Sequence, residues 1–264
     1  MSFREASAIK GSPGTWTAEV REGWDIFGVS NGGYLMAIVT RAMEVESGGR
    51  LLISTTGHYL NPTSAGPVSI DVATLKEGRS MSMLRAKLSR GDRQLLTVTA
   101  VLADPGMEGF EGDLIVGEPP DLPPPEECVL AEPAESAPLP PPFSGKVEIR
   151  VHPDDARPMY GEKSGHPVMR GWFRLRDDED LDPHAVVLAA DAFPPAIFNS
   201  NLPVGWTPTI NLAVQVRNPA PRGWLACRFS TRFVTSGMLE EDGELWDEEG
   251  RPVALSRQLA LMPR

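Results

Sequence analysis

Cysteine and histidine are scarce in this sequence, which has two cysteines and four histidines among its 264 residues. Cys128 and Cys227 are too few for a disulfide framework, so both are expected to stay reduced. No Cys or His spacing typical of a metal site occurs, and neither a metal nor an organic cofactor is predicted.

Long apolar runs and a positive net charge are also missing. No run approaches the ~20 residues of a membrane-spanning helix, and the opening "MSFREASAIKG" lacks the apolar core of a secretory leader. The formal net charge of −11 argues against general attraction to nucleic acid or anionic lipid. We expect a cytoplasmic protein that binds an anionic ligand only through a local basic patch.

Proline, by contrast, is abundant, with 26 residues. Many of them fall between Glu118 and Pro142, a segment that favours extended polyproline II and cannot donate a full set of strand hydrogen bonds. This composition predicts a proline-rich linker at residues 113–146. It separates an N-terminal domain, 1–112, from a C-terminal domain, 147–264.

The two flanks of this linker resemble each other. "HYLNPTSAGPVSIDV" in the first half matches "VQVRNPAPRGWLACRF" in the second, with the Asn-Pro pair and a later glycine at equal spacing. Each Asn-Pro pair follows one apolar strand and precedes another, so it marks a turn. The matched order of turns and strands indicates an internal duplication.

Each half combines one helix with several antiparallel strands. "NGGYLMAIVTRAME" predicts a helix capped by Ser30 or Asn31, and "DPHAVVLAADAF" predicts one capped by Asp182 with Pro183 at its first position. The rest of each half has strand-length apolar or alternating stretches, and this order predicts an α+β fold rather than a parallel α/β sheet. The expected strands are 68–75, 81–90, 94–103, 209–217, 225–234 and 253–262.

The first helix begins beside a G-x-S-x-G motif centred on Ser30. A serine-hydrolase elbow would need a parallel sheet and a histidine late in the chain, and none of the four histidines lies in the last ~80 residues. The glycines could instead form only a helix entrance. We favour a third interpretation, in which the free backbone N–H groups of Gly32 and Gly33 bind a carbonyl oxygen or an anion.

The second helix carries an unusual carboxylate. Asp191 follows Val187 and Leu188 at helical spacing, on the face that the apolar residues define. An unpaired buried carboxylate costs several kcal/mol, so Asp191 needs a partner or a chemical role. The alternative is a helix-end residue near solvent, because Pro194 follows closely.

Two polar residues on later strands could meet Asp191. Gln258 is flanked on its own strand face by Ser256 and Ala260, whose small size suits close approach of a helix. Strand alternation places Thr209 with Asn211 on the polar face, where solvent exposure is the simpler expectation.

With these features, the sequence resembles the acyl-CoA thioesterase II family over most of its length. The motifs that carry the resemblance are "IFGVSNGGYL", "GHYLNPTSAG" and "LKEGRSMSMLRAKLSRGDRQLLTVTA" in the first half, and "LAADAF", "TPTINLAVQVRNP" and "DGELWDEEGRPVALSRQLAL" in the second. The resemblance implies a double hotdog fold, a hydrolase acting in lipid metabolism, and catalytic residues at Asp191, Thr209 and Gln258.

The sequence departs from the family at two places. Members often have an acidic residue and a histidine after the Thr-Ile pair, where this chain has Asn211 and Leu212. The family arginine before Pro-Gly in the first half is here Asn61. Both differences concern substrate range and rate more than fold.

The predicted reaction is hydrolysis of an acyl-CoA thioester without a covalent intermediate. Asp191 orients or deprotonates a water molecule, Thr209 and Gln258 fix that water and the carboxylate, and the backbone N–H of Gly32 or Gly33 polarises the carbonyl. A thiolate leaves readily, because a thiol has a pKa near 8.5.

Two charged stretches complete the sequence-based predictions. The basic strand pair predicts contacts with the coenzyme A phosphates, although a solvated charged strand is the alternative. The residues concerned are Lys76, Arg79, Ser80 and Arg85, in a patch that also contains Lys87, Arg90 and Arg93. The acidic run "EEDGELWDEEG" is expected to be a solvated turn around Gly243 and Gly250.

Three other functions stay open at this point. The chain could bind acyl ligands without turnover, with Asp191 in a structural role. It could be a hotdog hydratase, which usually needs a paired histidine, or a serine hydrolase that uses Ser30. A homo-oligomer formed through the sheets is compatible with the resemblance, whereas acyl chain length is not indicated.

Overall fold

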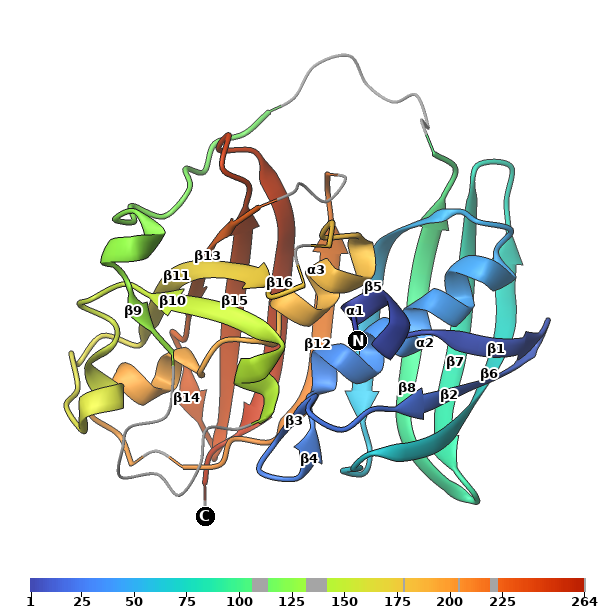
Figure 1. The fold of residues 1–264 in the computed structure, drawn as a ribbon, viewed down its shortest axis with the longest axis horizontal. Helices are drawn as coiled ribbons and strands as arrows, with labels where there is room; N and C mark the ends of the chain where they lie inside the picture. The colour runs from blue at the N-terminus through green and yellow to red at the C-terminus, as the bar shows by residue number, and fades with distance from the viewer. Residues whose placement is uncertain (106–113, 132–141, 178, 204, 219–222, 264) are drawn as a thin grey trace.

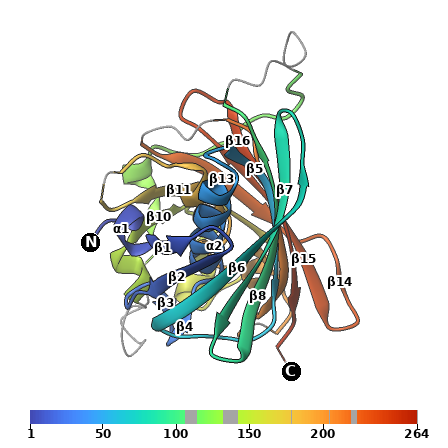
Figure 2. The same ribbon diagram turned by 90° about the vertical axis from the view of Figure 1, so that its right-hand side faces the viewer.

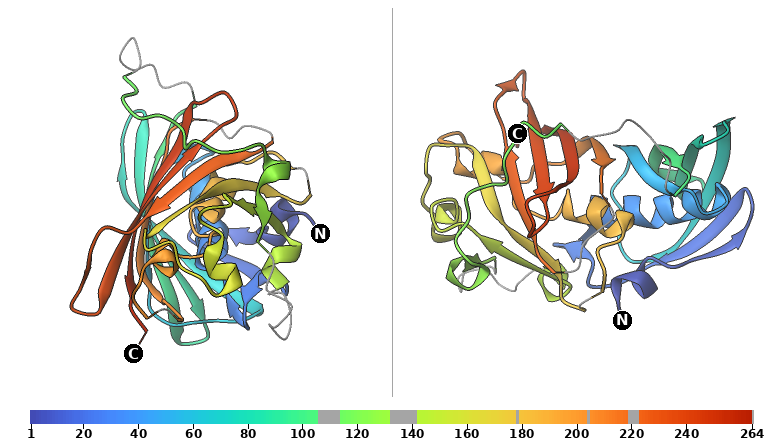
Figure 3. Two further views of the ribbon diagram at one scale, coloured as in Figure 1. Left: turned by 90° about the vertical axis from the view of Figure 1, so that its left-hand side faces the viewer. Right: turned by 90° about the horizontal axis from the view of Figure 1, so that it is seen from above.

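The computed structural model describes residues 1–105, 114–131, 142–177, 179–203, 205–218 and 223–263, and it is shown in Figures 1, 2 and 3. The first half contains α1 (Phe3–Ala6), α2 (Gly32–Glu46) and the strands β1 (Ile9–Ser12), β2 (Thr15–Val20), β3 (Asp25–Ile26), β4 (Val29–Ser30), β5 (Leu51–Tyr59), β6 (Gly66–Glu77), β7 (Met81–Arg90) and β8 (Arg93–Ala103).

The second half has one short α-helix and a similar run of strands. Its elements are α3 (Pro183–Ala189), the 3₁₀ turns η1 (Pro125–Glu127), η2 (Pro142–Gly145), η3 (Arg157–Tyr160) and η4 (Ala196–Asn199), and the strands β9 (Val129–Leu130), β10 (Val147–Val151), β11 (Val168–Leu175), β12 (Thr209–Val216), β13 (Leu225–Ser230), β14 (Val234–Thr235), β15 (Met238–Trp246) and β16 (Pro252–Leu261).

All the strands named above except β3 and β4 join into one antiparallel 14-stranded sheet, and β3 pairs with β4 in a separate hairpin. Its order is β1-β2-β6-β7-β8-β5-β12-β16-β15-β13-β11-β10-β9, with β14 paired to β15. The halves meet where β5 pairs with β12, for example Gly57 opposite Leu212. Figure 2 shows the sheet curving around α2, and Figure 1 shows α2 and α3 side by side in the middle of the molecule.

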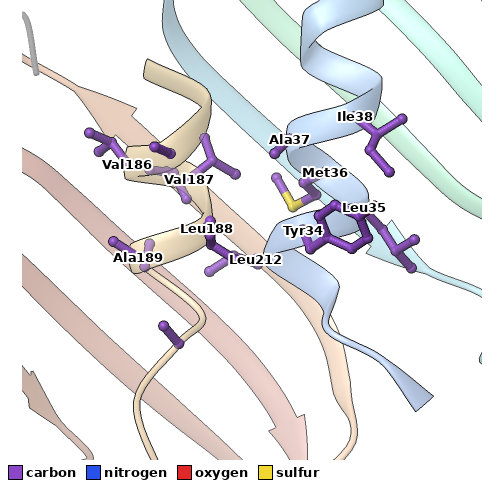
Figure 4. Close-up of a cluster of buried hydrophobic side chains, with 14 of the residues drawn as sticks. Tyr34, Leu35, Met36, Ala37, Ile38, Val186, Val187, Leu188, Ala189 and Leu212 are labelled. Atoms are coloured by element: carbon purple, nitrogen blue, oxygen red, sulfur yellow. The ribbon is translucent and has the colours of Figure 1, made fainter. Parts of the chain in front are cut away.

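The helix α2 begins where the sequence predicts, and it is buried on nearly all sides. Asn31 is its N-cap, and the Asn31 side chain accepts a hydrogen bond from the Tyr34 backbone N–H. Apolar side chains of α2 and α3 pack together with Leu212 of β12 (Figure 4). Burial of these side chains is the main stabilising contribution of the two helices.

Two specific contacts fix α2 against α3. The Nδ1 atom of His184 lies 2.9 Å from Thr40 Oγ1, and its Nε2 atom lies 2.9 Å from Glu44 Oε2. At Gly33 the helices approach so closely that an added Cβ atom would lie 2.9 Å from the Val187 carbonyl oxygen. The helix N-terminus of one half is thereby held against the helix C-terminus of the other.

The predicted α+β double hotdog is confirmed, since each half wraps antiparallel strands around a central helix. Part of the predicted linker takes part in the fold, because β9 pairs with β10 and the Trp172 indole N–H donates to the Pro123 carbonyl at 2.8 Å. The linker residues 132–141, and the end of the first predicted domain at 106–112, lie outside the described residues. The domain boundaries stay a prediction.

Two sequence predictions are wrong in detail. The second helix begins at Pro183 with Asp182 as its N-cap, as predicted, but it ends at Ala189 instead of continuing to Phe193, so Asp191 follows the helix instead of lying in it. The acidic run is no turn around Gly243, because that glycine is in the middle of β15. Its alternation buries Glu241 and leaves only the turn at Gly250 as predicted.

Among the described residues, no helix has the length and apolar character needed to cross a membrane.

Candidate active site

A cavity of about 670 Å³ lies where the two halves meet. Its walls come from the β3–β4 hairpin, the N-terminus of α2, the end of β5, the segment after α3, and β12, β15 and β16. Most of the lining is apolar and includes Ile26, Phe27, Leu35, Leu60, Phe143, Val147, Ile149, Phe193, Phe198, Trp206, Ile210, Phe229 and Leu261. All three predicted catalytic residues line this one cavity.

Asp191 is bound by the N-terminus of α2. Its Oδ2 atom accepts hydrogen bonds from the Gly33 backbone N–H at 2.8 Å and from the Asn31 Nδ2 at 3.2 Å. Asn31 also donates to the Asp191 backbone carbonyl at 2.8 Å. The carboxylate therefore lies at the positive end of the α2 dipole, where negative charge is stabilised.

The environment of Asp191 shifts its titration toward neutral pH. Burial raises the pKa of this carboxyl from 3.8 to about 6, although the hydrogen bonds from Gly33, Gly32 and Asn31 act in the opposite direction. A carboxyl with a pKa near 6 is a better proton acceptor at neutral pH than an ordinary aspartate. Such a shift in a cavity is typical of a residue with a catalytic role.

Thr209 reaches the cavity because of an irregularity in β12. The pairing of β12 with β16 shifts register between Thr209 and Asn211, so that Thr209 lies opposite Ala260 while Leu212 lies opposite Gln258. Simple alternation put Thr209 on the outer face with Asn211, and that expectation is wrong because a bulge turns the strand. Gln258 Nε2 donates to Thr209 Oγ1 at 2.6 Å.

The three predicted residues are thus brought to one cavity, but the described hydrogen bonds join only two of them directly. Thr209 and Gln258 form a pair on the sheet, whereas the Asp191 carboxylate bonds to Asn31 and Gly33 on the other side of the cavity. A water molecule between them would meet a base on one side and polar side chains on the other.

A second carboxyl, Glu241, lines the same cavity and was not predicted from the sequence. It is only 8% exposed, and its Oε2 accepts a hydrogen bond from the Ala196 backbone N–H at 2.5 Å. Burial raises its pKa to about 7, opposed by the Ala196 N–H and reinforced by the charges of Asp191 and Glu240. The alternation Leu239, Glu241, Gly243 along β15 is the signal that could have identified it.

Tyr59 is another cavity residue that the sequence did not single out. Its hydroxyl is buried and has no hydrogen-bond partner among the described residues. Burial and the charge of Asp191 raise its pKa well above the usual range, so it stays protonated. A Cβ atom at Gly32 would lie 2.9 Å from this hydroxyl, which explains why glycine occupies that position.

The glycines at the helix entrance have a role different from the predicted one. Gly33 donates its N–H to Asp191, and the Gly32 N–H also stabilises the ionised Asp191. Gly33 binds an anion, as expected, but that anion is a side chain of the protein, so the Gly33 amide is already used by Asp191. A role of the Gly32 N–H toward a substrate carbonyl stays a prediction. Ser30 ends the short strand β4, the strand pairs of the main sheet are antiparallel, and within the described residues no histidine bonds to the Ser30 hydroxyl, so the serine-hydrolase elbow is not formed.

The residues predicted to bind coenzyme A phosphates lie elsewhere. Lys76, Arg79 and Ser80 surround the β6–β7 turn, and the strand register places them roughly 15–25 Å along the sheet from Tyr59. Arg85 is exposed on the outer face of β7. None of the four lines the cavity, because the hairpin carries its basic residues to the opposite end of the sheet from the site.

Two other arginines of the predicted basic patch do lie close to the cavity. Arg93 Nη2 donates to Asn61 Oδ1 at 2.9 Å, and Asn61 lines the cavity. Arg90 Nη2 donates to the Ser64 carbonyl at 2.8 Å, next to cavity residue Thr63. In the part of the chain that the structure describes, there is no group of three or more His, Cys, Asp or Glu side chains placed to hold a metal ion.

Two family models match the chain. The acyl-CoA thioesterase N-terminal domain matches residues 20–103, and the acyl-CoA thioesterase C-terminal domain matches residues 125–262. The second match begins within the predicted linker, at η1 and just before β9. An uncharacterised protein of Mycobacterium tuberculosis strain H37Rv is 25% identical over 286 aligned positions, covering 100% of this chain and 97% of the relative.

Solved structures of similar fold cover nearly the whole chain. A candidate thioesterase II from Thermobifida fusca is 29% identical, with a TM-score of 0.88 over 99% of this chain and 97% of that one. An acyl-CoA thioesterase II from Mycobacterium marinum superposes with a TM-score of 0.73 over 99% and 98% of the two chains at 15% identity. The likeness to the Mycobacterium marinum structure shows the fold alone.

Proposed function

Since the chain belongs to the acyl-CoA thioesterase family, we propose that it hydrolyses an acyl-CoA thioester with a water molecule activated at Asp191, without a covalent intermediate. The observation that carries this proposal is the position of Asp191. A partly buried carboxyl with a pKa of about 6 faces the same cavity as the Thr209–Gln258 pair. The three residues come from three different segments of the second half: the residues just after α3, β12 and β16.

The proposed reaction begins with a water molecule between Asp191 and the sheet. Asp191 accepts a proton from the water while the oxygen of the water bonds to the acyl carbon. The carbon–sulfur bond then breaks. The thiolate takes the proton that Asp191 accepted and leaves as coenzyme A, while the released carboxylic acid carries the oxygen of the water. Atoms balance without a cofactor.

Thr209 and Gln258 orient the water. Because Gln258 donates its amide N–H to the Thr209 oxygen, the Thr209 hydroxyl keeps its own proton to donate. Orientation of this kind lowers the entropic part of the barrier, and small displacements of such groups reduce rates strongly.

The apolar walls of the cavity support an acyl substrate. Aromatic and aliphatic side chains line most of it, and such surface favours a hydrocarbon chain over a polar group. We expect release of free thiol from acyl-CoA by the unmodified protein. A chain that binds acyl-CoA but releases no thiol at any acyl length would instead be a binding module.

The pH dependence tests the role of Asp191. Because only the ionised carboxyl accepts a proton, kcat should fall to half near pH 6 and then about tenfold for each further pH unit of acidification. Thiol release measured with a dithiodipyridine reagent, which reports at acid pH, gives this profile. A limb near pH 4, the range of an ordinary aspartate, would contradict the proposed environment of Asp191.

A further inference from the structure

The cavity contains a second buried carboxyl that the proposed reaction does not use. Glu241 is on β15 and Gln258 on the neighbouring strand β16, and the two residues lie directly opposite each other in the register. Side chains opposite each other on antiparallel strands share one face, with Cβ atoms about 4.5–5.5 Å apart. Both side chains line the cavity.

The same carboxyl also contacts the segment that carries Asp191. Glu241 Oε2 accepts the backbone N–H of Ala196, five residues after Asp191. One oxygen of Glu241 is therefore used to hold this segment. Glu241 lies between the two parts of the site, the base on one side and the Thr209–Gln258 pair on the other.

The orientation of the Gln258 amide decides what Thr209 can do. The amide has a donating nitrogen at one end and an accepting oxygen at the other, and the groups around it select which end faces Thr209. With the nitrogen toward Thr209, the Thr209 hydroxyl keeps its proton for the water. With the oxygen toward Thr209, the Thr209 hydroxyl donates to the Gln258 amide oxygen and cannot donate to the water.

We propose that Glu241 is a positioning residue for this pair: as a protonated acid it donates to the amide oxygen of Gln258 and so keeps the amide nitrogen toward Thr209. This inference rests on the proposed function. When Glu241 ionises, its oxygen attracts the amide nitrogen of Gln258 instead. The amide then turns over, and the water loses the Thr209 proton.

Burial, reinforced by nearby charges, makes Glu241 ionise near neutral pH, and the Gln258 amide would turn over in the same pH range. Burial raises the pKa of Glu241 to about 7, and the nearby charges of Asp191 and Glu240 raise it as well. Neighbouring inward side chains on β16, Ser256 and Ala260, carry no charge. A second limb is therefore expected in the rate profile, in which kcat falls as pH rises through about 7.

Two substitutions at Glu241 and one control test the proposal. Glu241→Gln supplies a donor and an acceptor at every pH, so it should keep kcat at pH 6.5 and lose the decline above pH 7. Glu241→Leu removes both the donor to Gln258 and the acceptor of the Ala196 N–H, and kcat should fall roughly tenfold or more, with little change in KM. The control Glu244→Gln removes a carboxylate from the outer face of the same strand, where Glu244 pairs with Arg228.

Asp191→Asn, assayed alongside, separates this inference from the proposed function. If Asp191→Asn is inactive but both Glu241 variants follow the wild-type profile above pH 6, the role of Glu241 is overturned and the proposed reaction stands. If Asp191→Asn stays active, the proposed reaction is contradicted, whatever the Glu241 variants show. Thermal melts show whether Glu241→Leu is folded under the assay conditions. If it is not, the pH profile of Glu241→Gln alone tests the role of Glu241.

Discussion

Asp191→Asn should lower kcat by roughly 10²–10⁴-fold while the protein folds normally. The substitution removes the proton acceptor but keeps the size of the side chain, and general-base catalysis contributes about this much to a rate. The amide oxygen of asparagine can still accept the Gly33 N–H that now bonds to Asp191 at 2.8 Å. Thiol release from acyl-CoA and a thermal melt at the same pH measure both effects.

The same substitution should not reduce stability above pH 6, because the folded protein raises the pKa of Asp191 above its ordinary value of 3.8. A raised pKa means that the buried carboxyl contributes stability in its protonated form, which is lost as pH rises through about 6. Asparagine stays neutral, so the Tm of Asp191→Asn at pH 8 should equal or exceed that of the wild type.

Ser30→Ala is the matched control, since Ser30 lines the same cavity but has no role in the proposed reaction. It should keep most of the activity. An inactive Ser30→Ala beside an active Asp191→Asn would favour nucleophilic catalysis by serine and contradict the proposed function.

Gly33→Ala should reduce both stability and activity. Its added Cβ would lie 2.9 Å from Asp191 Cβ, 2.9 Å from the Val187 carbonyl oxygen and 3.0 Å from Leu188 Cα. Alanine favours a helix over glycine by about 0.5–1 kcal/mol, but overpacking of this kind costs about 1–3 kcal/mol, so the clash should win. We expect a fall in Tm of roughly 2–8 °C, at about 2–4 °C for each kcal/mol.

The effect of Gly33→Ala on activity comes from displacement of Asp191. Moving the carboxyl by about 1 Å should lower kcat by roughly 100-fold. Gly145→Ala is the control, because a Cβ at that position meets nothing within 4 Å. Wild-type Tm and kcat in Gly33→Ala would show that the two helices tolerate a side chain at their contact.

Much of the fold follows from local signals in the sequence. The caps at Asn31 and Asp182 and the strand periodicity determine where the main elements begin, and the duplication predicts how they assemble. Asp191 and Gln258 could be identified because a carboxylate or an amide beside small and apolar residues is unusual. Their contacts in the fold could not be predicted in the same way.

The remaining features depend on pairing between distant segments. Thr209 enters the cavity through a register shift that only the pairing of β12 with β16 reveals. The Gly33 amide faces Asp191 because α2 and α3 pack side by side in opposite directions, which brings together two residues 158 positions apart in the chain. Lys76 and Arg79 lie at the β6–β7 turn, and the length of this hairpin, which only strand pairing reveals, carries them away from the site.

A single-turnover reaction in H₂¹⁸O tests most directly whether Asp191 acts as a base toward water. With enzyme in excess over acyl-CoA, direct attack by water places one ¹⁸O atom in the acid of the first turnover and none in the peptide that contains Asp191. Attack by the Asp191 carboxylate on the thioester would form an anhydride. An unlabelled acid together with ¹⁸O in the Asp191 peptide would contradict the proposed mechanism.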